Sequence, residues 1–114
     1  IKKPLPSESK YLFSADKNNL VHISENILTI NGKVSELEFA NYTKPIIFKN
    51  KLIDNISLTD IDQKLIYLFD SNSNLVPNFP VFGSSKIDLF EDKNSRKYIT
   101  SVGESDEILV YSLY

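Results

Sequence analysis

The feature that most limits the fold is a hairpin pattern that recurs three times along the chain. The three copies read YLFSADKNNLVHIS, ISLTDIDQKLIYLF and YITSVGESDEILVYSL. They begin at residues 11, 56 and 98, so they lie 45 and 42 residues apart. Each copy has an apolar run of about five residues, a polar turn and a second apolar run, which is the pattern of a β-hairpin. The chain is therefore predicted to be an antiparallel all-β protein built from repeats.

The segments around the hairpins also recur. KPIIFKN, from residue 44, and KIDLFED, from residue 86, precede the second and third hairpins at the same 42-residue spacing. TINGKVSELEF, with an Asn31-Gly32 turn signal, follows the first hairpin, and DSNSNLVPNFPVFG follows the second. With the strands of a unit labelled a to d, the chain is predicted to read b-c-d, a-b-c-d, a-b-c. Units of about 42 residues are typical of propeller blades, which indicates a partial β-propeller.

The domain organisation follows from these units. We predict a single all-β domain over residues 1–114, with units at about 10–43, 44–85 and 86–114. Because the last unit stops after its third strand, we expect the chain to be the C-terminal part of a longer protein. Such an incomplete ring would leave open sheet edges, and we expect self-association through them.

The third strand of a unit is apolar without alternation, at residues 65–69 and 108–111. A strand with one wet face alternates apolar and polar residues, so these strands are expected to be covered on both faces, as in stacked blades. Pro77 and Pro80 fall on the outer strand, where a missing N–H donor is tolerated. A β-sandwich is the alternative fold. KVSELEFANYTK lacks a helical cap and stripe and ends at Pro45, so we predict strand plus loop there.

Composition excludes several classes of function. The formal net charge of −2 offers no basic footprint for nucleic acid, and no apolar run is long enough for a membrane span. The absence of Cys removes disulfides, thiolate nucleophiles and Cys-based metal sites. With 41% apolar and 25% charged residues, the chain has the composition of an ordinary globular domain.

YLFDSNSNLVPNFPVFG resembles the repeats of bacterial β-propellers of the VCBS/FG-GAP and pyrroloquinoline-quinone-like kind. Those repeats have a strand ending in Phe-Asp, an Asn/Gly turn and a Pro-Gly-Phe-Pro-Val edge strand, similar to residues 68–70, 71–74 and 77–81 here. The resemblance covers most of residues 44–113. It implies an extracellular, periplasmic or cell-surface protein. Because the chain has no Trp, the tryptophan docking of quinone-binding blades has no counterpart, and no quinone is expected.

The resemblance also implies a candidate calcium loop. The family's calcium loops carry Asp or Asn at alternating positions and a Gly for the sharp turn. Asp70, Asn72 and Asn74 have the alternation and are the metal-ligand candidates, but their loop lacks the Gly. An Asx-rich hairpin turn is the other interpretation, and no other cofactor is expected.

Other candidate groups give little chemistry. His22 is the only histidine, and in NLVHIS it is expected to be a partly buried hydrogen-bonding residue rather than a base. Asp60 and Asp62 are expected at a solvated hairpin tip rather than in an acid–base pair. Tyr42 and Tyr114 are the candidates for an exposed binding surface, although core packing is the usual role of strand aromatics.

These observations favour a non-catalytic β-repeat module that acts as a structural scaffold or protein-interaction domain. The alternatives are a carbohydrate-binding module, or a fragment of a propeller enzyme whose active site lies mostly outside this chain. The expected partners are proteins or glycans.

Overall fold

The computed structural model describes residues 11–49 and 53–113. Within these residues the chain forms strands, turns and loops, and the strands make three antiparallel sheets. This confirms the all-β prediction. The described residues include no helix that is long and apolar enough to cross a membrane.

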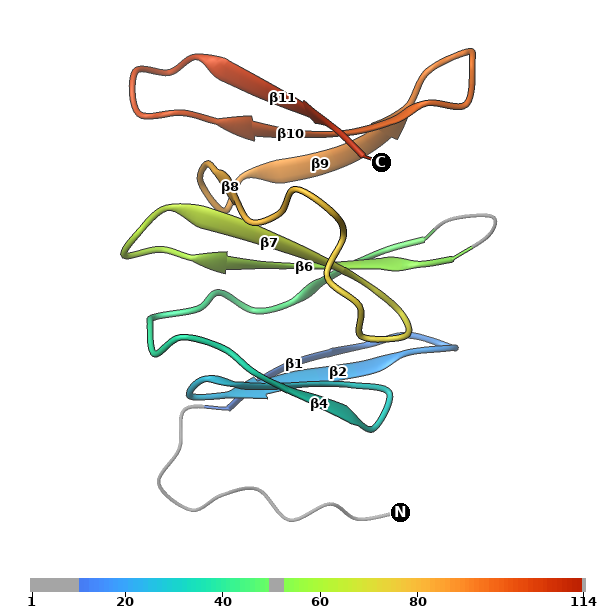
Figure 1. Cartoon of the computed structure of the whole chain (residues 1–114), viewed down its shortest axis with the longest axis vertical. Helices are drawn as coiled ribbons and strands as arrows, with labels where there is room; N and C mark the ends of the chain where they lie inside the picture. Colours follow the sequence, from blue (N-terminus) through green and yellow to red (C-terminus); the bar gives the residue numbers. More distant parts are fainter. Residues whose placement is uncertain (1–10, 50–52, 114) are drawn as a thin grey trace.

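Each sheet contains strands that follow one another along the chain. Sheet A has the order β1 (Tyr11–Ala15), β2 (Leu20–Ser24), β3 (Ile27–Ile30), β4 (Lys33–Glu36). Sheet B has the order β5 (Ile46–Phe48), β6 (Asn55–Asp60), β7 (Leu65–Asp70), β8 (Val81–Phe82). Sheet C has the order β11 (Ile108–Ser112), β10 (Lys97–Val102), β9 (Ile87–Glu91). The sheets form successive layers along the long axis, with sheet B in the middle (Figure 1).

The strand count of the first unit differs from the prediction. Sheet A has four strands instead of three, because residues 27–36 form a second hairpin of their own. Its turn is Asn31-Gly32, with φ of 50° and 86°, the two positive values that a type I′ hairpin turn requires. The first recurrent hairpin therefore forms the first and second strands of its sheet, β1 and β2. The other two recurrent hairpins, β6–β7 and β10–β11, form the second and third strands of theirs. Sheets B and C have the predicted four and three strands.

Two apolar cores lie between the three layers. The core between sheets A and B is formed by Val21, Ile23, Leu28, Ile30, Tyr42, Ile56, Leu58 and Phe69. The core between sheets B and C is formed by Ile66, Leu68, Val76, Phe79, Ile99 and Leu113. Because side chains alternate along a strand, β7 contributes to both cores from its two faces. All six residues of β6 are buried. Sheet B is thus covered on both sides, and the molecule has three layers rather than the two of a sandwich.

The expectation of two covered faces holds for β7 and is wrong for β11. Leu109 and Tyr111 are partly buried, but Ile108 and Val110 are 74% and 55% exposed. The apolar sequence of β11 resembles that of β7, yet only β7 lies in a layer that has a neighbour on each side. Pro77 and Pro80 lie in the loop before the short edge strand β8 rather than within it.

Candidate functional site

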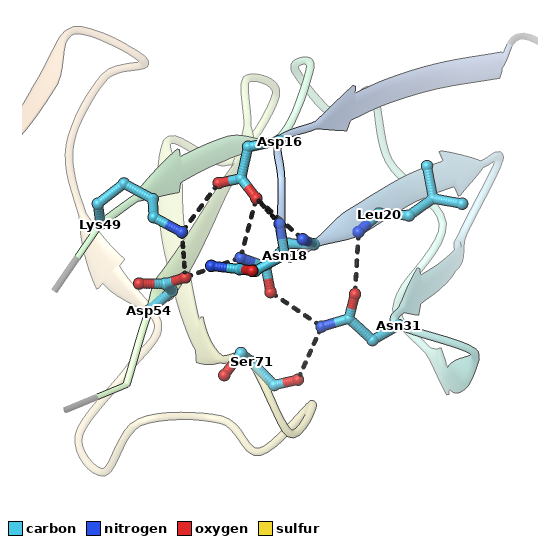
Figure 2. Close-up of polar contacts among 8 residues, drawn as sticks. Asp16, Asn18, Leu20, Asn31, Lys49, Asp54 and Ser71 are labelled. Carbon is cyan, nitrogen blue, oxygen red and sulfur yellow. Dashed lines mark hydrogen bonds and ion pairs between the residues drawn. The ribbon is translucent and has the colours of Figure 1, made fainter. Parts of the chain in front are cut away.

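An extensive polar cluster among the described residues joins the β1–β2 and β3–β4 turns of sheet A to sheet B (Figure 2). We call it the A–B polar cluster; it contains Asp16, Asn18, Asn19, Asn31, Lys49, Asp54 and Ser71. It begins at Asp16, directly after β1. The Asp16 Oδ1 atom accepts the backbone N–H groups of Asn18 at 2.8 Å and Asn19 at 2.9 Å. This Asx-type geometry forms the β1–β2 turn and aims the second carboxylate oxygen at sheet B.

Charged groups connect the two sheets in this cluster. Lys49 Nζ lies 3.3 Å from Asp16 Oδ2 and 2.7 Å from Asp54 Oδ2. Asn19, which is buried, donates from Nδ2 to Asp54 Oδ2 at 2.8 Å. The backbone N–H of Asn18, together with Lys49, holds the pKa of Asp16 below its ordinary value. The hydrogen bond to Asp54, followed by Asp16, raises the pKa of Lys49.

Asn31 extends the cluster from the β3–β4 turn. Its Oδ1 atom accepts the backbone N–H of Leu20 at 2.9 Å. Its Nδ2 group donates to Asn19 Oδ1 at 2.9 Å and to the Ser71 carbonyl at 3.2 Å. One side chain thus joins the β1–β2 and β3–β4 turns of sheet A to the loop after β7. Because Asp16, Asp54 and Asn31 are committed to these bonds, the arrangement is suited to holding the sheets together rather than to proton transfer.

A cleft of about 850 Å³ adjoins the cluster. Its walls come from the end of β1, the segment leading into β5, and Ser85 ahead of β9. Lys17, Lys44 and Lys49 line it together with the hydroxyl residues Ser14 and Thr43. Such a lining can hydrogen-bond an anionic group. The carboxylate in this lining, Asp16, is already paired with Lys49.

The predicted metal ligands Asp70, Asn72 and Asn74 lie together in the turn after β7. Asp70 Oδ1 accepts the backbone N–H groups of Asn72 at 2.9 Å and Asn74 at 3.0 Å. Its Oδ2 atom lies 3.4 Å from Asn74 Nδ2. This is the geometry of the Asx-rich turn, the second interpretation of the motif. Among the residues that the structure describes, no group of three or more His, Cys, Asp or Glu is placed to hold a metal ion.

The turn after β9 has the same geometry as the Asp70 turn, and the sequence analysis did not identify this likeness. Asp92, after β9, accepts the backbone N–H groups of Asn94 at 2.8 Å and Arg96 at 3.0 Å. Ser73 and Ser95 occupy equivalent positions and have φ of 69° and 64°. The signal was present as the recurrent Asp-x-Asn spacing at the ends of strands. These aspartates serve to close hairpin turns.

Tyr42 is not part of an exposed platform. Its side chain is 7% exposed and lies in the core between sheets A and B, where its ring meets the edge of Tyr67 at 6.1 Å. Its hydroxyl donates to the Glu38 carbonyl. Burial raises the pKa of Tyr42 above its ordinary value, and the nearby Tyr67 and Asp60 add to the effect. Tyr114 lies outside the described residues.

The two aspartates of the β6–β7 turn differ in burial, because Asp62 is exposed and Asp60 is not. Asp60 is completely buried, so the expectation of a solvated tip is wrong for this residue. Its Oδ1 atom accepts the backbone N–H groups of Asp62 and Gln63, while its Oδ2 atom has no hydrogen-bond partner. The segment before β5 covers it, because Tyr42 forms a β-bridge with Asp60. Asp62 is exposed and accepts the Asn41 N–H at 3.2 Å. His22 is half-buried on β2.

Comparison with protein-family models finds no match to the chain, and searches of curated proteins and of solved structures find none either.

Proposed function

We propose that this chain is a non-catalytic module of propeller-blade-like units that acts as a structural scaffold or protein-interaction domain. The resemblance of its second unit to bacterial propeller repeats favours a secreted or envelope protein as its setting. The single observation that carries the proposal is the apolar character of the outward faces of sheets A and C. Sheet B has no such face, because both of its sides are covered by the other two sheets.

The outward face of sheet A carries a row of residues that are opposite one another in register. The row crosses all four strands and consists of Phe13, His22, Thr29 and Val34. Val34 is 65% exposed and Phe13 is also exposed at the other end of the row, whereas His22 is half-buried and Thr29 is buried. Within this row the exposed apolar side chains therefore belong to the edge strands β1 and β4, and exposed apolar surface is typical of interaction sites.

The outward face of sheet C is similar. Ile108 and Val110 project from β11, and Phe90, 45% exposed, projects from β9. Phe90 stacks on Tyr98 with ring centroids 5.1 Å apart, so the aromatic pair forms a flat apolar area beside the two aliphatic residues. Both ends of the three-layer stack therefore offer a surface that another β-sheet can cover.

The arrangement of the first strands supports blade-like units. β1 and β5 are the first strands of sheets A and B and contact each other, and the Ser14 hydroxyl of β1 donates to the carbonyl of Pro45, directly before β5. In sheets A and B the chain then progresses away from this side strand by strand. Successive sheets with adjacent first strands and face-to-face packing are what a propeller arrangement requires.

The experiment measures apolar dye binding and sedimentation velocity over a wide concentration range. Val34→Asp on sheet A and Phe90→Asp on sheet C should each reduce dye binding and weaken any association. Ile61→Asp is the matched control, because Ile61 is 51% exposed but lies in the β6–β7 turn. A wild-type protein that binds no dye and sediments as a monomer at every concentration would contradict the proposal.

A further inference from the structure

Asn31 is the one asparagine of the chain that is followed by glycine, and the two residues form the turn between β3 and β4. Because glycine has no Cβ, its backbone nitrogen is open to attack on the preceding side chain. We propose that Asn31 is a modification site: when the β3–β4 turn opens, its side chain cyclises onto Gly32 and is converted to aspartate or isoaspartate. The conversion breaks the link that Asn31 makes between sheets A and B.

The reaction needs water and no other reactant. The Gly32 backbone nitrogen gives up its proton to the solvent and attacks Asn31 Cγ, so the bond from N to Cγ forms and the bond from Cγ to Nδ2 breaks. Nδ2 takes up a proton and leaves as ammonia, and a five-membered cyclic imide is formed. Water then adds to one of the two imide carbonyl carbons and returns a proton to the nitrogen. Opening at Cγ gives aspartate, and opening at the backbone carbonyl gives isoaspartate, in which the main chain runs through Cβ and Cγ.

The closed turn keeps the two reacting atoms apart. Asn31 and Gly32 have φ of 50° and 86°, as in a type I′ turn, whose first central residue has ψ of about +30°. At that ψ the Gly32 nitrogen lies on the opposite side of the Cα–C bond from Asn31 Cβ, whereas ring closure requires the two to be nearly eclipsed. The reaction therefore requires a rotation about this bond, and that rotation opens the turn.

Four hydrogen bonds among the described residues hold Asn31 in the closed turn. Leu20 and Asn31 exchange two of them: the Leu20 N–H donates to Asn31 Oδ1 at 2.9 Å, and the Asn31 N–H donates to the Leu20 carbonyl at 2.9 Å. The other two run from Asn31 Nδ2 to Asn19 Oδ1 at 2.9 Å and to the Ser71 carbonyl at 3.2 Å. The side chain has to leave these partners before Cγ can be attacked. The rate of modification is thus set by how often this part of the A–B polar cluster opens.

The product cannot restore the closed arrangement. An ionised carboxylate has no proton to donate to Asn19 or Ser71. Isoaspartate also adds a backbone atom between the paired residues Ile30 and Lys33, so the two-residue turn no longer matches the register of β3 and β4. Because Asn31 is exposed, water reaches the imide and solvates the new charge. The modification therefore makes permanent an opening that hydrogen bonding would otherwise reverse.

Ageing of the full chain at mildly alkaline pH tests the proposal, with peptide mass spectrometry to quantify the modification of each asparagine. Isoaspartate at position 31, resolved from aspartate by chromatography, identifies the cyclic imide, since direct hydrolysis of the side-chain amide gives aspartate alone. The folded chain should be modified at Asn31 at least ~10-fold more slowly than the same chain unfolded in urea. The slowing should match the hydrogen-exchange protection of the Leu20 N–H, which is bonded to Asn31 Oδ1.

A variant of the cluster tests whether its opening sets the rate. Asn19→Ala removes one acceptor of Asn31 Nδ2 and should raise the rate at Asn31 about 2- to 10-fold, the factor to which one hydrogen bond corresponds. Asn18→Ala is the matched control, because the bond from Asn18 to Asp16 comes from the backbone N–H, which the variant keeps. Asn94, in the turn after β9, is the internal reference, and its rate should be the same in all three proteins. Circular dichroism confirms that each variant is folded.

Aspartate without isoaspartate at position 31, or equal rates in the folded and the unfolded chain, would overturn the proposal. Equal Asn31 rates in Asn19→Ala and Asn18→Ala would also contradict it. A rise at Asn94 as large as that at Asn31 would assign the rate to global unfolding and would contradict the role of the cluster. If Asn19→Ala does not fold, the comparison of the wild-type slowing with the Leu20 exchange protection decides, and a mismatch between them refutes the proposal.

Discussion

Asn31→Asp should destabilise the protein by removing the two hydrogen bonds that Asn31 donates within the A–B polar cluster. The change is nearly isosteric, and the remaining oxygen can still accept the Leu20 N–H. The bonds to Asn19 Oδ1 and the Ser71 carbonyl are lost, because an ionised carboxylate has no proton to donate. With a net value of ~0.5–1.5 kcal/mol for each bond, the free energy of unfolding should fall by about 1–3 kcal/mol.

Urea unfolding measures this loss. At ~1–3 kcal/mol per molar for the denaturant slope of a small domain, the midpoint should fall by roughly 1 M. Asn18→Asp is the matched control, because it adds the same charge beside the same cluster while the turn bond from the Asn18 backbone N–H is kept. Lowering the pH until the introduced carboxyl is protonated should narrow the difference from wild type, since one donor returns. If Asn31→Asp were no less stable than Asn18→Asp, the Asn31 side chain would not contribute to holding sheets A and B together.

Two further predictions concern the contact between sheets B and C and the acid stability of the cluster. Gly83→Ala should destabilise the fold by ~1–3 kcal/mol in urea unfolding, because the added Cβ would lie 2.5 Å from Ile66 Cδ1 and 2.7 Å from Ser101 Oγ. Gly103→Ala, whose Cβ meets the mobile end of a long side chain, should cost less; the opposite order would refute this explanation. Because the pKa of Asp16 is lowered in the folded protein, its stabilising contribution is complete above the ordinary value of 3.8 and is lost as the pH falls below it. The free energy of unfolding, measured as a function of pH, should therefore fall less in acid for Asp16→Asn than for the wild type.

Much of the local structure could be predicted from the sequence, because hairpins depend on neighbouring residues. Apolar runs separated by polar turns located the strands of sheets B and C, and the Asn31-Gly32 dipeptide marked a turn. The same dipeptide implied a strand at residues 27–30, yet the repeat alignment assigned three strands instead of four to the first unit. The alignment failed there because it matched hairpins by their apolar pattern, which does not distinguish first from second strands.

The candidate sites were harder to predict. Asp60 and Asp62 have similar sequence surroundings, yet Asp60 is buried because the distant Tyr42 segment pairs with it. Tyr42 lies in a loop-like sequence and is nevertheless a core residue. The A–B polar cluster left no sequence signal, since its bonds join residues as far apart as Asn19 and Asp54, or Asn31 and Ser71.

The amino-acid sequence by itself determined that this chain forms antiparallel hairpins closed by Asp- and Asn-rich turns, because strand pattern and turn chemistry act over a few residues. Only the tertiary structure decided which apolar faces are covered. β7 and β11 carry nearly the same kind of sequence, but one lies in the middle layer and the other at the end of the stack. Whether a strand face is covered depends on whether another sheet packs against it, and a short stretch of sequence does not determine that.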